Sequence, residues 1–435
     1  MVDTRTDRPR TTPVPVTTGT RQFWEQSFGK AVGETTTLFG TLPVPHAPEE
    51  DLGTVDPDLR RAIGSAAPGT PVARPADPWA ALEAAASAAV TVRRAVAADR
   101  YVLHRAYPSP RALFGVDLER VDAAGRREVL LPWSGATAPA DRRRSPDHAG
   151  TPDRRGLVAR IRPDRYPTPY AGLRPSLARL EAGHLLATVA AAAHHLGVDP
   201  ATVLHAHGDE VARLTQRPDP TGPGWTIAPD VIGSLVRASS DGPDGPPPTV
   251  DAWFARRTSG PSTANLITSR EVPDPARQRI DAVVAAGLAA VAPLYAAGAL
   301  TVHRTTLVGR GMSERYLTPL RPDGAGPERP MASTGAWASA AGLTWSVDPR
   351  RLAAVMGPGA LESVHVLLGW LAQWVCLSAA ACGIAARPAR NFDEPTWAHD
   401  LGLDAGAVPA YQVWLRPLAD NDLTPAAWTT YGRNT

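Results

Sequence analysis

The chain has 435 residues and a formal net charge of +2 at pH 7, with 43% hydrophobic and 20% charged residues. This length allows two domains with a sizeable core, and the near-neutral charge gives no electrostatic footprint for nucleic acid or an acidic membrane. We therefore expect neither partner. The basic residues are almost all arginine, because Lys30 is the only lysine, and this excludes Schiff-base chemistry.

The predicted elements begin after an N-terminal arm, residues 1–75, that is expected to be partly disordered. The first unit then spans residues 76–240. Its expected elements, in chain order, are a helix at 79–98, a strand pair, a charged loop at 135–156, a helix ending at Gly197 and a capped amphipathic helix at 199–215.

A run of Asp, Gly and Pro at residues 241–249 is the clearest linker, and the second unit spans residues 250–435. Its expected elements, in chain order, are a helix ending at Arg257, a helix at 275–289, a strand at 301–308, a loop at 321–335, a strand at 343–347, a long helix and a late strand at 408–415. Helices intermixed with antiparallel strands predict an α+β fold.

The two units repeat each other at an offset of about 186 residues. An apolar run opens around Gly183 and ends at Gly197, and its counterpart opens around Gly369 and ends at Gly383, so that both intervals are 14 residues. Two fused copies imply an intramolecular pseudo-dimer, with a long apolar helix from each copy at the seam. A ligand cleft is then expected between the copies.

Residues 364–386 carry no formal charge, which raises a transmembrane interpretation. Polar residues inside the run, such as His365 and Gln373, and the shorter counterpart at 182–198 favour a buried helix at the seam. Cys376 and Cys382 lie on this helix and face different directions, so we expect no disulfide and no metal site. The start of the sequence shows no secretory hydrophobic segment, and a cytoplasmic location is expected.

A cluster of arginines and hydroxyls stands where a helix of the second unit ends and a turn begins. It consists of Arg256, Arg257, Thr258 and Ser259. Two guanidinium groups with adjacent hydroxyls suit a phosphate monoester, because arginine binds phosphate with two parallel hydrogen bonds. The alternative is a solvated helix terminus.

The order of several motifs resembles the nitroreductase-like FMN flavoprotein family. These motifs are the Arg-Arg-Thr-Ser cluster, Pro273-Asp274, Ala292-Pro293, the Gly-Trp-Leu-Ala-Gln run from Gly369 and the segment 387–393. The resemblance implies two tandem nitroreductase-like domains that together form the homodimer-like unit of that family. It also implies that an Arg-x-Ser element holds the FMN phosphate, while a Pro-Ser element of the partner copy completes each flavin site.

In this chain the cluster at 256–259 belongs to the second unit, and the Pro-Ser element, Pro108-Ser109, belongs to the first. Arg387 and Arg390 would flank the flavin edge. The second unit carries Pro293-Leu294 instead, and the first unit lacks a good Arg-x-Ser element. The resemblance therefore implies one intact flavin site and one degenerate site.

Within that family the first unit looks most like the SagB-type azoline dehydrogenases of ribosomal peptide (thiopeptide-like) biosynthesis. Those enzymes oxidise peptide thiazolines or oxazolines to thiazoles or oxazoles with FMN. The likeness lies in the segments 105–109 and 180–184, Arg-Ala-Tyr-Pro-Ser and Leu-Glu-Ala-Gly-His. The family's catalytic Lys-Tyr pair falls on Arg165-Tyr166, and Arg111 replaces a glycine. Tyr166 is then the candidate base, and Arg165 is expected to lower its pKa.

The resemblance implies a modified precursor peptide as substrate and a cyclodehydratase as partner; a homodimer of the fused chain stays open. Two other readings also stay open. One is a flavin-dependent reductase of dehydroamino acids or nitro compounds. The other is a non-catalytic scaffold or peptide-binding subunit of a heterocycle synthetase, which the substitutions at Arg111 and Arg165 would suit.

Overall fold

The computed structural model describes most of the chain from residue 77 to residue 417. The described ranges are 53–54, 77–95, 103–131, 136–140, 155–216, 224–240, 249–259, 271–308, 314–331, 341–390 and 392–417. The expected N-terminal arm, apart from residues 53–54, and the linker up to residue 248 lie outside these ranges.

The first unit is built on an eight-stranded antiparallel sheet with the order β1-β6-β5-β4-β7-β9-β8-β10. Its strands are β1 (Gly53–Thr54), β4 (Val116–Val121), β5 (Arg127–Leu130), β6 (Ala136–Pro139), β7 (Gly156–Ile161), β8 (Ala201–His207), β9 (Glu210–Thr215) and β10 (Trp225–Ile227). A separate two-stranded ladder joins β2 (Val92–Ala95) to β3 (Leu103–Arg105).

The second sheet has seven strands in the order β13-β12-β11-β15-β17-β16, with β14 paired to β12. Its strands are β11 (Leu300–Val308), β12 (Glu314–Arg321), β13 (Gly324–Ala325), β14 (Arg329–Pro330), β15 (Ala341–Val347), β16 (Ile384–Ala389) and β17 (Val408–Pro417). The central path β12-β11-β15-β17-β16 repeats the path β5-β4-β7-β9-β8 of the first sheet in chain order and in pairing, so the two units share one topology.

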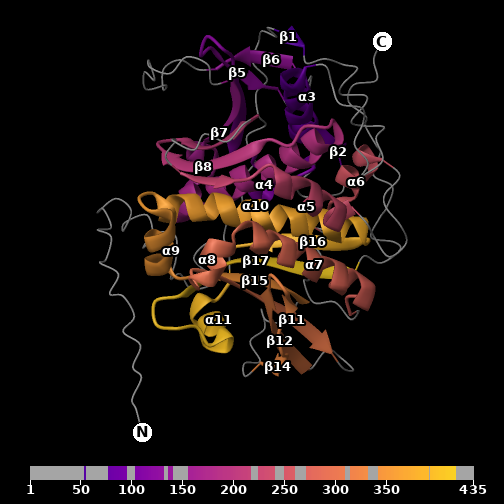
Figure 1. Ribbon diagram of the computed structural model, residues 1–435, viewed down its shortest axis with the longest axis vertical. Helices are drawn as coiled ribbons and strands as arrows, with labels where there is room; N and C mark the ends of the chain where they lie inside the picture. The colour runs from indigo at the N-terminus through magenta and orange to yellow at the C-terminus, as the bar shows by residue number, and fades with distance from the viewer. Residues whose placement is uncertain are drawn as a thin grey trace.

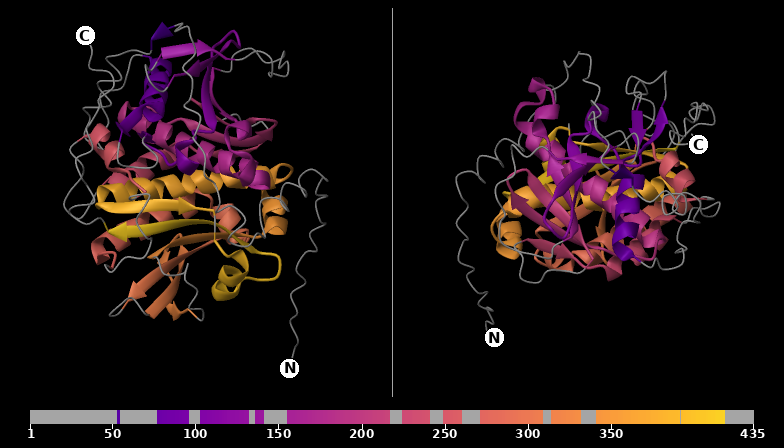
Figure 2. Two further views of the ribbon diagram at one scale, coloured as in Figure 1. Left: turned by 180° about the vertical axis from the view of Figure 1, so that it is seen from behind. Right: turned by 90° about the horizontal axis from the view of Figure 1, so that it is seen from above.

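Helices fill the space between the sheets and cover their flanks. They are α3 (Pro78–Val90), α4 (Arg174–His195), α5 (Asp230–Ser240), α6 (Val250–Arg256), α7 (Asp274–Ala290), α8 (Ala292–Ala296), α9 (Pro349–Met356), α10 (Ala360–Ala381) and α11 (Glu394–Leu401), with short 3₁₀ turns η1 (Pro110–Ala112), η3 (Pro163–Arg165) and η4 (Thr168–Leu173). Figure 1 shows α4 and α10 as a middle layer, with the first sheet above and the second below, and the view from behind in Figure 2 agrees.

The two long helices of the repeat cross at a pair of glycines. A Cβ atom built on Gly183 of α4 would lie 2.0 Å from the carbonyl oxygen of Val366, and one built on Gly369 of α10 would lie 1.9 Å from the carbonyl oxygen of Leu180. Adding 186 to 180 gives 366, so each contact is the repeat partner of the other. This reciprocity is the signature of a two-fold interface, here formed within one chain.

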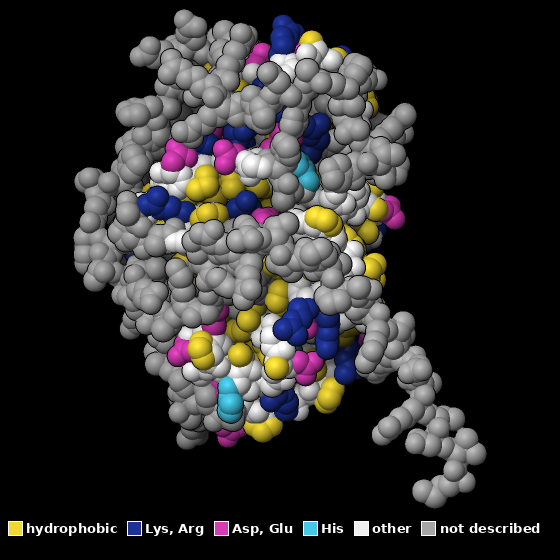
Figure 3. Space-filling model, turned by 90° about the vertical axis from the view of Figure 1, so that its left-hand side faces the viewer, with side chains coloured by type: hydrophobic (Ala, Val, Ile, Leu, Met, Phe, Trp, Pro, Cys, Tyr) yellow, Lys and Arg dark blue, Asp and Glu magenta, His cyan; other side chains and the backbone are white. Residues whose placement is uncertain are grey.

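Neither central helix has one polar side, because the core covers both helices all round. Helix α10 is long and apolar enough to cross a membrane, yet every residue of its most hydrophobic window is buried within the protein. The predicted buried helix at the seam is therefore confirmed for the described structure. On the face shown in Figure 3, basic and acidic side chains are interspersed rather than gathered into one charged patch.

An ion pair between helix and sheet also occurs in both units. Glu83 of α3 pairs with Arg120 of β4 at 3.2 Å, and Asp281 of α7 pairs with Arg304 of β11. Both arginines occupy the same strand of the shared topology. The repeat therefore extends from the backbone path to a partly buried charged contact.

Most expected elements are confirmed, including the helix at 275–289 and the strands at 301–308, 343–347 and 408–415. The helix expected at 199–215 is wrong, because these residues form the hairpin β8–β9, in which Gly208 adopts a φ of 58° at the turn. The helix expected at 79–98 ends at Val90, and the chain then enters β2.

Candidate functional site at the seam between the two copies

The segment 257–259 leaves helix α6 and runs beside the edge strand β16. The carbonyl oxygen of Thr258 accepts a hydrogen bond from the backbone N–H of Ala386 at 2.9 Å. The carbonyl oxygen of Ser259 accepts one from the Nε of Arg387 at 3.0 Å. Three predicted site residues of the second copy are thus brought together by strand β16.

Arg257 connects this segment to the first copy. Its guanidinium is only 4% exposed and donates to the Ser259 Oγ at 3.3 Å and to the carbonyl oxygen of Arg105 at 3.4 Å. Since Arg105 is four residues before Ser109, and extended chain spans about 3.5 Å per residue, the Pro108-Ser109 element lies within about 14 Å of this contact. The two predicted clusters therefore lie on the same side of the seam.

Two other predicted arginines behave differently. Arg256, the last residue of α6, is exposed. Arg390 is 6% exposed, forms an ion pair with Glu394 one helical turn later in sequence, and lies 5.7 Å from the centre of the Phe392 ring. The charge of Arg390 is therefore already balanced by a buried carboxylate, which weakens its expected part in binding a flavin.

Ser109 belongs to a compact cluster of hydroxyls around one buried carboxylate. The Ser109 Oγ donates to the Glu181 Oε2 at 2.6 Å, and the Tyr166 hydroxyl donates to the same oxygen at 2.7 Å. The backbone N–H of Phe114 in turn donates to the Ser109 Oγ at 2.8 Å. Ser109 and its neighbour Pro108 are partly exposed, whereas Glu181 and Tyr166 are each 1% exposed.

Burial is the largest effect on the ionisation of this cluster. It raises the pKa of the Glu181 carboxyl above its ordinary value, although the hydrogen bonds from Ser109 and Tyr166 act in the opposite direction. Burial also raises the pKa of the Tyr166 phenol well above 10, and the neighbouring Glu181 charge raises it further. At neutral pH the tyrosine therefore keeps its proton.

The expectation that Arg165 would lower the pKa of Tyr166 is wrong. The guanidinium of Arg165 turns away and donates to the carbonyl oxygen of Phe114 at 2.9 Å and to the Asp117 carboxylate at 2.6 Å. The immediate charged neighbour of Tyr166 is instead the acidic Glu181. Arg165 contributes to the site by fixing the loop that carries Phe114.

Arg105 is a buried cation beside the loop that carries Phe114. It is 6% exposed, donates to the Tyr107 hydroxyl at 2.6 Å and stacks 3.8 Å from the centre of the Phe114 ring. In the part of the chain that the structure describes, Arg105 forms no ion pair, and its Nε makes no hydrogen bond. A buried guanidinium without a carboxylate partner favours binding of an anion beside it.

The loop after Ser109 has an unusual backbone. Arg111, Ala112 and Phe114 have φ values of 52°, 54° and 49°, in the left-handed region that favours glycine. Gly115 follows, and a Cβ atom there would lie 2.2 Å from the Tyr166 ring. Arg111 thus adopts a conformation that glycine takes more readily, and such strain concentrates at functional sites.

A second polar network ties both copies together below this loop. His184 contacts the Gln373 Oε1 through Nδ1 and the Tyr411 hydroxyl through Nε2, both at 2.9 Å. The Gln373 amide donates to the carbonyl oxygen of Ala106 and to the Thr188 hydroxyl, both at 3.0 Å. Burial lowers the pKa of His184 to about 3, so this histidine is a neutral core residue.

Sequence reasoning missed Glu181 and Arg105 as site residues. Glu181 had a visible signal, because it is the one acidic residue within the otherwise Ala- and Leu-rich helix α4. At the corresponding position of α10, 186 residues later, stands the buried Leu367. Leu294, equally buried, occupies the position that corresponds to Ser109. The cluster of Ser109, Tyr166 and Glu181 therefore has no equivalent at these positions of the second copy.

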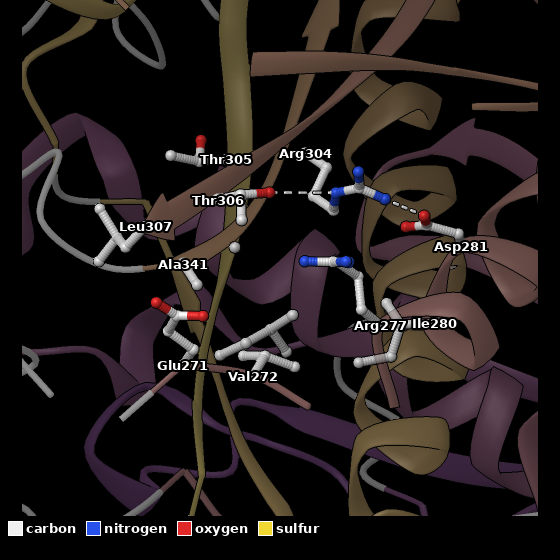
Figure 4. A pocket seen from close by; sticks show the side chains of 12 residues that line it. Glu271, Val272, Arg277, Ile280, Asp281, Arg304, Thr305, Thr306, Leu307 and Ala341 are labelled. Carbon is white, nitrogen blue, oxygen red and sulfur yellow. Dashed lines mark hydrogen bonds and ion pairs between the residues drawn. The ribbon is translucent and has the colours of Figure 1, made fainter. Parts of the chain in front are cut away.

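A separate groove lies within the second copy, between α7 and the sheet, and holds about 380 Å³ of empty space that is partly open to solvent (Figure 4). At one end Arg304 pairs with Asp281 and donates to the Thr306 Oγ1 at 3.3 Å. Burial raises the pKa of Asp281 to about 6, against the effect of Arg304. None of the predicted site residues lines this groove.

The donor set at the seam fits a flavin mononucleotide. The guanidinium groups of Arg257 and Arg387 and the hydroxyls of Thr258 and Ser259 suit a phosphate group, and the buried Arg105 is a further cation in contact with Arg257. The described ranges leave out residues 96–102 and 260–270, which flank both segments.

No protein-family model and no curated protein matches the sequence. Among solved structures, a proposed nitroreductase from Anabaena variabilis is similar along 92% of this chain and 99% of its own, with 12% identity and a TM-score of 0.60. Another proposed nitroreductase, from Ralstonia eutropha, covers 50% of this chain and 90% of its own at 12% identity, with a TM-score of 0.28 that is too low to indicate a shared fold.

The fold is nitroreductase-like. The similarity to the Anabaena variabilis protein spans both units, and both units have the same strand order about reciprocal helices α4 and α10. The chain is thus an α+β protein of two tandem nitroreductase-like domains that form an intramolecular pseudo-dimer.

Proposed function

We propose that this protein is an FMN-dependent oxidoreductase with its flavin at the seam between the two copies. The observation that carries the proposal is the contact of Arg257 with the carbonyl oxygen of Arg105, which brings the cationic segment 257–259 beside the segment 105–109. The residues that would hold FMN are Arg257, Thr258, Ser259 and Arg387 from the second copy and Arg105, Pro108 and Ser109 from the first.

The reaction that we propose is the oxidation of thiazolines or oxazolines in a modified precursor peptide to thiazoles or oxazoles. This reaction removes a proton from the ring α-carbon and a hydride from the β-carbon, and bound FMN supplies the hydride acceptor. A buried acid–base cluster next to the seam, Ser109, Glu181 and Tyr166, supports the proposal because the α-proton needs an acceptor. A cyclodehydratase would supply the azoline.

Colour and mass test this proposal. The purified protein should be yellow and release FMN on heating, and a thiazoline-bearing peptide incubated with it in air should lose about two mass units per ring. Consumption of NADPH with a dehydroalanine peptide, and no loss of mass from the thiazoline, would instead identify a reductase. A colourless protein that binds no added FMN would contradict the proposal and favour a scaffold.

Two arginine substitutions test whether Arg257 binds the FMN phosphate directly or only adds positive charge to the protein. Arg257→Gln should weaken FMN binding about 10- to 100-fold, because a hydrogen bond to a charged group contributes roughly 1.5–3 kcal/mol. Arg237, exposed on α5, provides the matched control, and Arg237→Gln should leave the affinity unchanged. Equal affinities for all three proteins, measured by fluorescence quenching of FMN, would remove Arg257 from the site.

A further inference from the structure

The surroundings of the Glu181 carboxylate favour reversible uptake of a proton over a permanent negative charge. Its Oε2 accepts hydrogen bonds from two neutral hydroxyls, those of Ser109 and Tyr166, at 2.6 and 2.7 Å. In the described part of the chain no arginine or histidine forms an ion pair with it. A buried carboxylate outside any ion pair binds a proton more tightly than an exposed one, and the effect of burial on Glu181 outweighs the opposite, through-space effect of Arg105.

The groups that face Glu181 are one cation and three phenols. Arg105 acts on it from the end of β3 and Tyr166 from the turn after η3. Tyr107 of the Ser109 loop and Tyr411 of β17 interact with it electrostatically. Burial raises the pKa of each phenol well above neutral, to about 12 for Tyr107. Glu181 is therefore the one member of this set that can accept a proton at neutral pH.

Ser109 is the member of the cluster that a bound molecule can reach. Tyr166 and Glu181 are 1% exposed, whereas Ser109 is partly exposed. The Phe114 N–H donates to the Ser109 Oγ and fixes its orientation, and the Ser109 hydroxyl points its proton at Glu181. A proton from a bound molecule can thus reach Glu181 by way of Ser109.

The second copy provides an internal control for a purely structural role. Helix α10 crosses α4 with reciprocal geometry, yet it carries Leu367 where α4 carries Glu181, and Leu367 is fully buried. The helix crossing therefore works with a leucine at this position. The helix crossing therefore does not explain the buried acid at the same position in α4. A role in proton transfer explains it, because buried ionisable groups concentrate at functional sites.

We propose that Glu181 is the proton acceptor of the reaction, reached through Ser109, and that Tyr166 is a positioning residue that orients the carboxylate. This inference rests on the proposed azoline oxidation. The Cα–H bond breaks, its electron pair forms the new Cα–Cβ double bond, and the proton passes to the Ser109 Oγ while the Ser109 proton moves to the Glu181 Oε2. The hydride that leaves Cβ carries two electrons to the flavin, and dioxygen is the final oxidant.

Turnover of a thiazoline peptide by FMN-loaded variants gives the first test. Glu181→Gln and Ser109→Ala should keep FMN and fall about 100-fold or more in kcat, the range of general base catalysis. Glu83→Gln removes a partly buried carboxylate that pairs with Arg120 and is not a member of the cluster, and it should leave kcat unchanged. Full turnover in Glu181→Gln would overturn the relay alone, whereas no oxidation by the unaltered protein would overturn the relay and the proposed function together.

Infrared titration gives a second readout that does not depend on turnover. The spectrum of the unaltered protein minus that of Glu181→Gln should contain a protonated carboxyl band with a midpoint above that of an exposed glutamate, because the bands of Asp281 and Glu83, whose pKa values burial also raises, cancel in this difference. Tyr166→Phe removes a hydrogen bond that lowers the pKa of Glu181, so the midpoint and the acid limb of kcat/KM should both move to higher pH. An unmoved acid limb in Tyr166→Phe, or a difference spectrum without a protonated carboxyl band, would overturn the assignment. If Glu181→Gln does not fold, the Ser109→Ala and Tyr166→Phe results decide.

Discussion

Arg111 carries a backbone conformation that is costly for any residue with a side chain. Its φ of 52° and ψ of 29° fall in the left-handed region, where an L-residue loses about 1–2 kcal/mol relative to the right-handed form. Arg111→Gly should therefore keep or raise the free energy of unfolding, whereas Arg111→Val should lower it by more than 1 kcal/mol because β-branched residues tolerate this region least. Urea denaturation of both variants checks this, and equal losses would show that the loop does not hold this conformation.

His184 gives the protein a defined weakness to acid. Its folded pKa of about 3 lies below the unfolded value of about 6.5, so its contribution to stability is fully present above pH 6.5 and is lost as the pH falls toward 3. Between pH 7 and pH 5 this should lower the free energy of unfolding by about 2 kcal/mol. Denaturation curves at both pH values measure the drop.

A pair of variants isolates that effect. His184→Gln should show a drop smaller by about 2 kcal/mol than the unaltered protein, since it has no proton to bind there. His399→Asn, at a side chain that is 77% exposed, should keep the full drop. An unchanged drop in His184→Gln would show that this histidine does not titrate on unfolding.

At the residue scale, sequence motifs pointed to part of the proposed site. Ser109 and Arg257 stood out by residue type and spacing, and the structure brings their segments together through Arg105. Glu181 and the direction of Arg165 were not foreseen, because each depends on which side chain lies opposite after folding. A carboxylate in a helix and an arginine in a loop look solvated until burial and partners are known.

At the scale of elements, the crossing of α4 and α10 depends on two residues without side chains. Gly183→Ala or Gly369→Ala would place a methyl group within about 2 Å of a backbone carbonyl oxygen, so the helices must separate. We expect a loss of about 3 kcal/mol or more in the free energy of unfolding, at the upper end of overpacking costs.

Gly287 of α7 is the matched control for that prediction. A Cβ atom there would lie 3.0 Å from a methyl group of Leu371, which can shift, and alanine favours a helix over glycine by about 1 kcal/mol. Gly287→Ala should therefore cost little or stabilise the protein. Thermal unfolding that ranks Gly287→Ala below Gly183→Ala would contradict the close crossing.

The long periodic or apolar elements could be predicted, and the segment 199–215 could not. Its Asp199 resembled a helix cap and its Asp209-Glu210 pair resembled a solvent-facing helix side, yet Gly208 turns the chain and β9 pairs with β7 about 50 residues earlier. The segment mixes helix formers (Ala, Leu, Arg) with strand formers (Val, Thr), so the long-range pairing decides. Local sequence does not contain that information.

On the scale of the whole molecule, fusion has allowed the two copies to diverge. A homodimer repeats every residue in both of its sites. In this chain the second copy has Leu294 at the position equivalent to Ser109 and Leu367 at the position equivalent to Glu181. The shared topology and the reciprocal glycine crossing keep the central scaffold symmetric, while the residues of the proposed site differ between the copies. In the proposed function each copy supplies a different part of a single site.

This arrangement predicts the number of flavins per chain. The segment 257–259 contacts the Ser109-bearing segment once, and the described part of the other copy offers leucine where an acid and a hydroxyl would be needed. Titration of flavin-free protein with FMN, followed by calorimetry, measures the stoichiometry directly. A single flavin at the seam predicts one FMN per chain, with binding weakened in Arg257→Gln; two equivalent sites, or no binding at all, would contradict it.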